Sequence, residues 1–146
     1  MKILVTGATG FLGKYVIDEL LAHDYSIVAF GRNEKIGKAL ENERVQFVKG
    51  DLSSIEELKQ AFQSVDAVVH AGALSTAWGP WKAFYQANVV GTQNVLDLCR
   101  EYAVKRLVYV SSPSIYAAGK DQLNIKESDA PKENHLNNYI RSKLVS

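Results

Sequence analysis

The chain has 146 residues, 47% of them hydrophobic and 23% charged, which is ordinary for one globular domain of roughly 100 to 200 residues. This composition excludes a disordered chain, a collagen-like chain and a disulfide scaffold, and the single cysteine, Cys99, cannot form an internal bridge. The 17 Lys and Arg residues nearly balance the 16 Asp and Glu residues, and the net charge of +1 predicts no attraction to nucleic acid or anionic lipid.

Short apolar runs and stretches of helical spacing alternate along the sequence. In chain order they predict a strand over residues 3–5, a helix over 11–24, a strand over 26–30, a helix over 36–40, a strand over 44–48, a helix over 55–62, a strand over 66–70, a helix over 80–101 and a strand over 106–110. Residues 117–138, rich in Lys, Asp, Asn and Glu, are expected to form a long loop. This alternation predicts an α/β fold with a parallel sheet of at least five strands covered on both faces.

A glycine-rich turn, Thr6-Gly7-Ala8-Thr9-Gly10-Phe11-Leu12-Gly13, joins the first strand to the first helix. Gly7 allows a tight turn, Gly10 lets the backbone approach a pyrophosphate, and Gly13 lets the helix pack closely on the strand. Free N–H groups at the helix start are donors for an anion. A tight turn alone would also explain the glycines, but their place between strand and helix favours a dinucleotide site. The predicted cofactor residues here are Gly7, Thr9, Gly10, Phe11, Leu12 and Gly13.

The end of the second strand bears on which dinucleotide binds. NAD-binding sequences place an acidic residue about 20 residues after the glycines, where it holds the ribose 2′-hydroxyl. This chain has Gly31-Arg32-Asn33 at that point. A guanidinium suits a 2′-phosphate in charge and geometry, so Arg32 favours NADP as the cofactor, with NAD as second choice. The alternative is that Arg32 is a solvated loop residue, and the nearby Glu34 could pair with it.

Tyr139 and Lys143 lie four residues apart, on one face of a predicted helix. An ammonium group near a phenol lowers the tyrosine pKa, which would let Tyr139 exchange a proton with a hydroxyl or carbonyl during hydride transfer. Such a pair also arises by chance on solvated helices. Ser111 and Ser112 strengthen the catalytic interpretation, because they follow the fifth strand at the edge where open sheets place ligands. Either serine could instead only form the turn before Pro113.

Several stretches together carry a family resemblance: Gly7-x-x-Gly10-x-x-Gly13, Asp51-Leu52, His70-Ala71-Gly72-Ala73, Asn88-Val89-Val90-Gly91-Thr92, Ser111-Ser112-Pro113-Ser114-Ile115-Tyr116 and Tyr139-x-x-x-Lys143. In this order they resemble the extended short-chain dehydrogenase/reductases, the epimerase and dehydratase superfamily, whose fold is a Rossmann-like doubly wound parallel sheet. Trp78-Gly79-Pro80 with Phe84, and the Ser-Pro-Ser-Ile-Tyr stretch, resemble the 3β-hydroxysteroid dehydrogenase-like branch.

The resemblance implies a role for each matching residue. Tyr139 would be the acid/base, Lys143 would hold the nicotinamide ribose, and Ser112 would be the catalytic serine. The other cofactor contacts would come from Asp51 and Leu52 at the adenine, and from Ala71, Gly72 and Ala73 after the fourth strand. Asn88 would brace the long helix, and His70 would be a packed residue at the end of a strand.

Other residues are assigned on weaker signals. Cys99, on the predicted long helix, is expected in the core. Trp78, Trp81 and Tyr116 would either edge a substrate pocket or simply pack, and the sequence leaves both interpretations open.

Members of this superfamily are usually much longer. The resemblance therefore implies that residues 1–146 form an NAD(P)-binding Rossmann domain, incomplete at its C-terminal end, without the last strands and the substrate domain. The helix that carries Tyr139 helps form a dimer in the family, so a homodimer is expected only of a longer form.

The predicted function is NAD(P)-dependent hydride transfer to or from a hydroxyl or ketone of a small-molecule substrate, either sterol-like or a nucleotide sugar. The alternatives are a non-catalytic dinucleotide-binding module and an inactive fragment of such an enzyme. No apolar run approaches the ~18 residues that a membrane span needs. The N-terminus lacks a signal-peptide pattern, so a cytoplasmic protein is expected.

Overall fold

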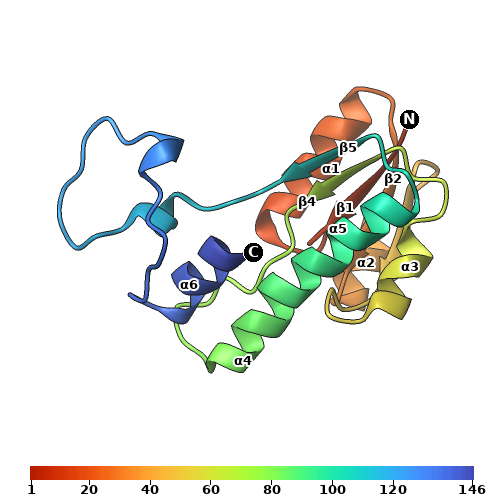
Figure 1. Ribbon diagram of the computed structural model, residues 1–146. Helices are drawn as coiled ribbons and strands as arrows, with labels where there is room; N and C mark the ends of the chain where they lie inside the picture. Colours follow the sequence, from red (N-terminus) through yellow and green to blue (C-terminus); the bar gives the residue numbers. More distant parts are fainter.

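A computed structural model describes residues 1–146 as helices packed on one parallel sheet (Figure 1). The strands are β1 (Lys2–Thr6), β2 (Ser26–Gly31), β3 (Val45–Lys49), β4 (Ala67–His70) and β5 (Arg106–Tyr109). They lie in the order β3-β2-β1-β4-β5, and every neighbouring pair is parallel. The prediction of a doubly wound α/β sheet is confirmed. The chain builds outward from β1 to β3 and then crosses to the other side of β1, where it adds β4.

The helices are α1 (Phe11–Ala22), α2 (Glu34–Leu40), α3 (Ile55–Ala61), α4 (Trp81–Phe84), α5 (Gly91–Glu101) and α6 (Asn138–Val145). The long helix predicted over residues 80–101 is present, but a π-helical segment, Tyr85–Val90, separates α4 from α5. Single π-helical turns inside helices occur frequently at functional sites. None of the helices combines the length and the apolar character that crossing a bilayer requires.

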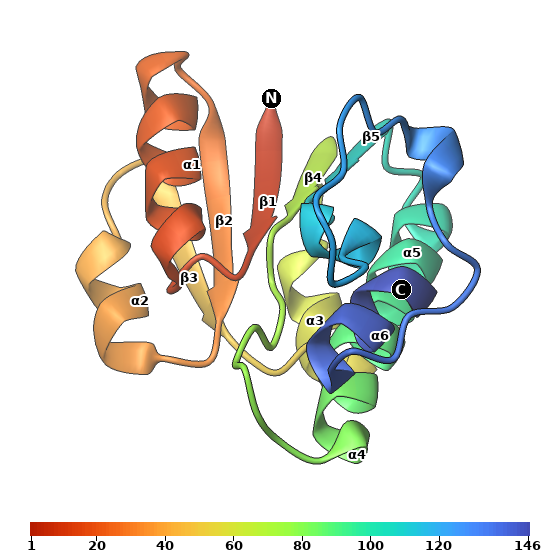
Figure 2. The same cartoon turned by 90° about the vertical axis from the view of Figure 1, so that its left-hand side faces the viewer.

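The sheet separates two hydrophobic cores, because successive residues of a strand point to opposite faces. On one face Leu4 of β1 packs in a cluster with residues of α3 and α5. On the other face Ile3 and Val5 pack in a cluster with Ile17 of α1. Figure 2 shows α1 and α2 on one side of the sheet and α3 and α5 on the other. Cys99 of α5 is buried in the first core, as predicted.

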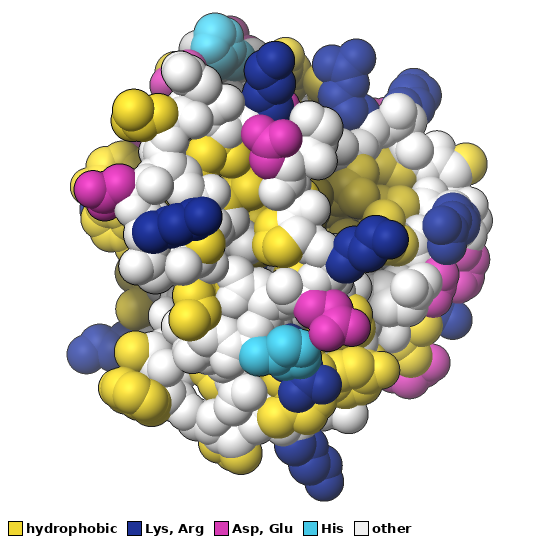
Figure 3. Space-filling model, turned by 60° about the vertical axis from the view of Figure 1, so that its left-hand side comes forward, with side chains coloured by type: hydrophobic (Ala, Val, Ile, Leu, Met, Phe, Trp, Pro, Cys, Tyr) yellow, Lys and Arg dark blue, Asp and Glu magenta, His cyan; other side chains and the backbone are white.

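The predicted long loop extends away from the sheet (Figure 1). Between residues 117 and 137 its one regular element is a 3₁₀ turn, Glu127–Asp129. The loop ends at Asn137, whose side-chain oxygen accepts a hydrogen bond from the Ile140 N–H at 2.8 Å and caps α6. Figure 3 shows a face on which acidic and basic side chains are interspersed with hydrophobic ones.

Candidate functional site

A cleft of about 510 Å³ lies at the carboxyl ends of β1, β2 and β4. It includes the boundary between β1 and β4, the point at which the order of the strands reverses and where open α/β sheets bind their ligands. The cleft brings together the predicted cofactor residues outside α6, namely Gly7, Thr9, Gly10, Phe11, Leu12, Gly13, Arg32, Asp51, Leu52, Ala71, Gly72 and Ala73.

Seven further residues complete the lining, and none of them was predicted as a cofactor residue. The further residues are Phe30, Gly31, Asn33, Gly50, Leu74, Ser75 and Ala87. Most of these residues adjoin predicted residues near the ends of strands. This position was the signal that could have found them. Ala87 gave no such signal, because it reaches the cleft only through the packing of the π-helical segment.

The glycine turn forms a cradle in which three backbone segments meet. Gly7 has a φ of +69°, and a Cβ atom there would lie 2.7 Å from the Cα atom of Gly72. A Cβ atom at Gly13 would lie 2.3 Å from the carbonyl oxygen of Gly7. Both distances are far below van der Waals contact, so the turn tolerates no side chain at these positions. The tight turn and the close helix–strand packing that the sequence predicted are confirmed.

The start of α1 is open toward the cleft. Its N-cap residue, Gly10, provides no side-chain hydrogen bond, so the first N–H groups of the helix have no capping partner. A Cβ atom at Gly10 would meet one neighbour, the carbonyl oxygen of Gly7 at 3.2 Å. A side chain at Gly10 would therefore meet less steric conflict within the protein than one at Gly7 or Gly13. This geometry fits a bound anion such as a pyrophosphate.

Arg32 and Asp51 face each other at the β2 end of the cleft. The guanidinium Nη1 lies 3.9 Å from a carboxylate oxygen of Asp51, and both side chains are substantially exposed. Glu34 pairs with Lys38 at 3.2 Å and with Lys49 at 3.0 Å. The alternative pairing of Arg32 with Glu34 is therefore wrong, and Arg32 keeps most of its donors free.

Asp51 is held in its charged form. Partial burial opposes ionisation, but the Ser53 N–H and hydroxyl donate hydrogen bonds to the carboxylate at 2.9 and 2.7 Å. Together with the charge of Arg32 they lower the pKa of Asp51 below its usual value. This end of the cleft thus carries a carboxylate held by Ser53 and an exposed guanidinium.

Ser112 follows β5 and caps the next turn. Its hydroxyl accepts a hydrogen bond from the Ser114 N–H at 3.3 Å and lies 2.7 Å from the Ser114 hydroxyl. This caps a 3₁₀ turn, Pro113–Tyr116, which is the turn chemistry that the sequence left as an alternative role. Ser112 does not line the cleft.

Tyr139 and Lys143 both lie on α6, as expected, but Lys143 contacts a different tyrosine. Tyr139 is half-buried, whereas Lys143 is buried, with 4% of its surface exposed. The ammonium group of Lys143 donates hydrogen bonds to the Tyr109 hydroxyl and, at 3.0 Å, to the carbonyl of Val110. No hydrogen bond joins Lys143 to Tyr139, and neither residue lines the cleft. Their catalytic roles stay predictions.

Asn88 connects the cleft to α6. Its side chain accepts a hydrogen bond from the Leu74 N–H at 2.7 Å and donates one to the Leu74 carbonyl at 3.0 Å. It also donates to the Ser142 hydroxyl at 2.8 Å, which in turn donates to the carbonyl of Tyr139 at 2.7 Å. Asn88 lies in the π-helical segment. Its hydrogen bonds connect the loop after β4 to the helix that carries Tyr139.

His70 is packed in the protein interior, as the sequence analysis predicted. Its two ring nitrogens lie 2.6 Å from the Thr6 hydroxyl and 3.0 Å from the Thr92 hydroxyl. Burial and the nearby charge of Lys143 lower the pKa of His70 to about 4. The imidazole is therefore neutral near pH 7.

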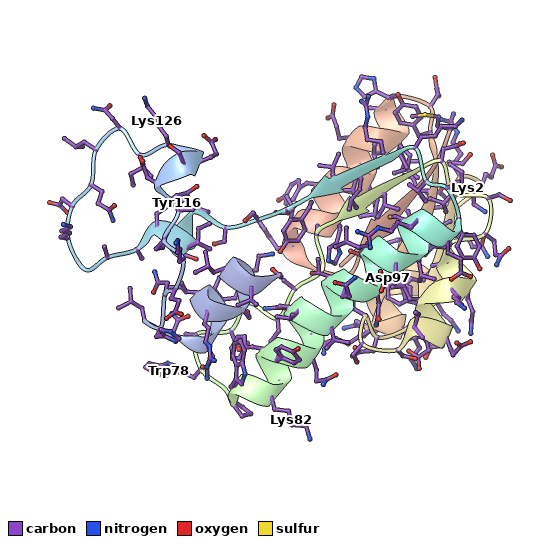
Figure 4. All side chains as sticks on the ribbon, in the orientation of Figure 1. Lys2, Trp78, Lys82, Asp97, Tyr116 and Lys126 are labelled. Atoms are coloured by element: carbon purple, nitrogen blue, oxygen red, sulfur yellow. The ribbon has the colours of Figure 1, made fainter.

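The three aromatic residues left open have different environments. Trp78 is 87% exposed and points away from the ribbon, and Tyr116 lies half-buried at the root of the long loop (Figure 4). The Trp81 ring lies 4.0 Å below the guanidinium of Arg141 and 5.7 Å from the ring of Tyr85. This contact favours the packing interpretation for Trp81, because it fastens α6 to α4.

The chain matches a known protein family over nearly its whole length. The family model described as "NAD dependent epimerase/dehydratase family" matches residues 3–146. The 2-alkyl-3-oxoalkanoate reductase of Shewanella oneidensis is 38% identical over 144 residues, covering 97% of this chain and 36% of that protein. The sterol-4-alpha-carboxylate 3-dehydrogenase, decarboxylating, of Bos taurus is 33% identical over 144 residues, covering 99% of this chain and 39% of that protein. The chain thus spans less than half the length of these curated relatives.

A solved structure shows the same fold with a dinucleotide bound. A short-chain dehydrogenase/reductase superfamily protein from Agrobacterium tumefaciens, crystallised with NAD, has a TM-score of 0.83 and 29% sequence identity to this chain. The match covers 99% of this chain and 42% of that protein.

Gly13→Ala tests the cradle. Helix propensity alone would stabilise the alanine variant by up to about 1 kcal/mol. The close contact with the Gly7 carbonyl should outweigh this, and we expect a loss of about 2 kcal/mol in the free energy of unfolding, as for overpacked sites. Urea denaturation measures the difference, with the exposed neighbour Lys14→Ala as control. A Gly13→Ala variant as stable as the parent would contradict the packing described.

His70 predicts a pH dependence of stability. Its folded pKa, about 4, lies below its ordinary value of 6.5, so the unfolded chain binds the proton more tightly. This contribution to stability is present above pH 6.5 and is lost as the pH falls toward 4. We expect the free energy of unfolding to fall by about 2 kcal/mol between pH 7 and pH 5. Urea denaturation at both pH values should show this loss in the parent and in His23→Gln but not in His70→Gln. An equal loss in all three would contradict the prediction.

Proposed function

The chain belongs to the NAD dependent epimerase/dehydratase family, and we propose that residues 1–146 form the dinucleotide-binding domain of an enzyme that transfers hydride to or from a small-molecule hydroxyl or ketone. The observation that carries this proposal is the glycine cradle, which opens onto a cleft at the strand-order reversal.

The lining residues fit the parts of a dinucleotide. The uncapped N–H groups at the start of α1, beside Gly10, would bind the pyrophosphate. Asp51 and Leu52 would contact the adenine, and Ala71 to Ala73 would line the nicotinamide half. When bound, the nicotinamide supplies or accepts the hydride.

We propose NADP rather than NAD as the preferred cofactor. The end of β2 carries Arg32 and Asn33 in place of an acidic residue. The Asn33 side chain is engaged in capping α2 through the Ile36 N–H at 3.1 Å, which leaves Arg32 to face the ribose. The ion pair of Arg32 with Asp51 is long and exposed, so it costs little to give up for a 2′-phosphate.

Residues of α6 and of the turn after β5 would handle the proton. In the oxidation direction the substrate carbon would give up its hydride to the nicotinamide, and the Tyr139 oxygen, in its phenolate form, would accept the hydroxyl proton. Lys143 would hold the nicotinamide ribose, and Ser112 would orient the substrate oxygen. The hydrogen bonds of Asn88 to Leu74 and to Ser142 fix the position of α6 relative to the cleft.

The names of the relatives suggest a substrate class. In both a 2-alkyl-3-oxoalkanoate and a sterol 4-carboxylate oxidised at position 3, the reacting carbon adjoins a carbon that bears a carboxylate. We propose that the complete protein acts on such a 3-hydroxy or 3-oxo carboxylate.

Tyr139→Phe separates binding from chemistry. The variant should bind NADPH within about twofold of the parent, as measured by nicotinamide fluorescence. It should lose at least about 100-fold in turnover of a 2-alkyl-3-oxoalkanoate, the size of a lost acid/base contribution. Tyr25→Phe is the matched control, since it removes a phenol oxygen far from the cleft. Turnover retained by Tyr139→Phe would remove Tyr139 from the mechanism, and no binding of either NADPH or NADH would overturn the function.

Arg32→Ala tests cofactor choice. We expect NADPH affinity to fall about tenfold, as for the loss of a charge-assisted hydrogen bond, while NADH affinity stays unchanged. Lys35→Ala, a nearby exposed cation outside the cleft, should alter neither. A parent that binds NADH more tightly than NADPH would contradict the proposed preference.

A further inference from the structure

A stack of two rings links β4 to β5 beneath the α6 lysine. His70 and Tyr109 are register partners on these neighbouring parallel strands, so their side chains lie on the same face. Their ring centroids are 5.5 Å apart with an interplanar angle of 23°. The Lys143 ammonium lies 4.1 Å from the centroid of the Tyr109 ring and donates a hydrogen bond to its hydroxyl.

The histidine at the base of the stack is fixed on both sides. Thr6 of β1 contacts one ring nitrogen and Thr92 of α5 contacts the other, which satisfies both nitrogens of a neutral imidazole. A neutral ring avoids repulsion with the Lys143 ammonium. Because His70 cannot rotate without breaking these contacts, the Tyr109 ring rests on a rigid support.

Tyr109 and the Val110 carbonyl engage two of the three N–H bonds of the ammonium group. Two fixed acceptors on a tetrahedral group set the direction of the third bond. The Tyr109 hydroxyl also lies 2.6 Å from the Ser146 hydroxyl, to which it can donate a hydrogen bond. Tyr109 is thus free to act as acceptor toward Lys143.

We propose that Tyr109, supported by His70, is a positioning residue for Lys143, which fixes the ammonium group in the place from which it would contact the nicotinamide ribose. The proposal rests on the proposed function, because it takes Lys143 as the ribose-binding residue. It adds two residues of the strands, outside the Tyr-x-x-x-Lys motif, to the binding machinery.

The test compares two ligands of the same cleft. NADPH spans both halves, whereas 2′,5′-ADP occupies only the adenine half and cannot contact Lys143. We expect Tyr109→Phe, which keeps the ring and its stacking, to weaken NADPH binding about tenfold, as for a lost hydrogen bond to a charged group, and to leave 2′,5′-ADP binding unchanged. Lys143→Ala should show the same pattern, and the double variant should lose no more than Lys143→Ala alone.

Tyr102→Phe is the matched control. Its hydroxyl contacts Gln63 at 3.3 Å at the surface, so the same atom is removed away from the stack and neither ligand should change affinity. Equal weakening of both ligands by Tyr109→Phe would indicate a general structural role and overturn the proposal. So would unchanged NADPH binding in Tyr109→Phe when Lys143→Ala weakens it. If the parent binds neither ligand, the proposed function is overturned. If Lys143→Ala leaves NADPH binding unchanged, the proposed contact of Lys143 with the ribose is overturned, and the positioning role of Tyr109 with it.

Discussion

The close approach of three backbone segments at Gly7, Gly13 and Gly72 is the constraint on which the rest of the site depends. A Cβ atom at Gly7 or Gly13 would come within 2.7 Å or 2.3 Å of a neighbouring backbone atom, so the turn, the helix and the loop after β4 meet without side chains between them. This brings the start of α1 against the sheet, with its N–H groups toward the cleft. Because backbone atoms cannot yield as a flexible side chain can, a side chain at either glycine would have to displace the backbone itself.

From this cradle, polar contacts extend across the sheet to the helix that carries the predicted acid/base. Gly72 donates its N–H to the Thr6 hydroxyl at 3.2 Å, and Thr6 also contacts His70. The stack of His70 on Tyr109 then reaches Lys143, while Asn88 reaches α6 from the other side. An eight-residue helix is marginal alone, so its position depends on these buried contacts. Cleft and helix are therefore coupled through satisfied buried polar groups.

Local pattern predicted the elements well where one physical rule dominated. Apolar runs in β1 and β2 and the spacing in α1 depend on burial, and their bounds agree within one or two residues. The glycine cradle was equally predictable, because a positive φ and a close approach leave few options besides glycine. The π-helical Tyr85–Val90 segment was not predicted, since Asn88 reaches the Leu74 backbone and Ser142 only once distant segments have packed.

The sequence by itself determined the α/β alternation, the glycine turn, and most of the residues that line the cleft at the strand ends. These follow from local periodicity and from the rule that carboxyl ends of parallel strands share one edge. Only the tertiary structure decided the partners of the charged groups: Arg32 pairs with Asp51 and not with Glu34, and Lys143 donates a hydrogen bond to Tyr109 and not to Tyr139. Such choices depend on strand register and helix docking, which place groups 19 to 34 positions apart in the chain within a few ångströms.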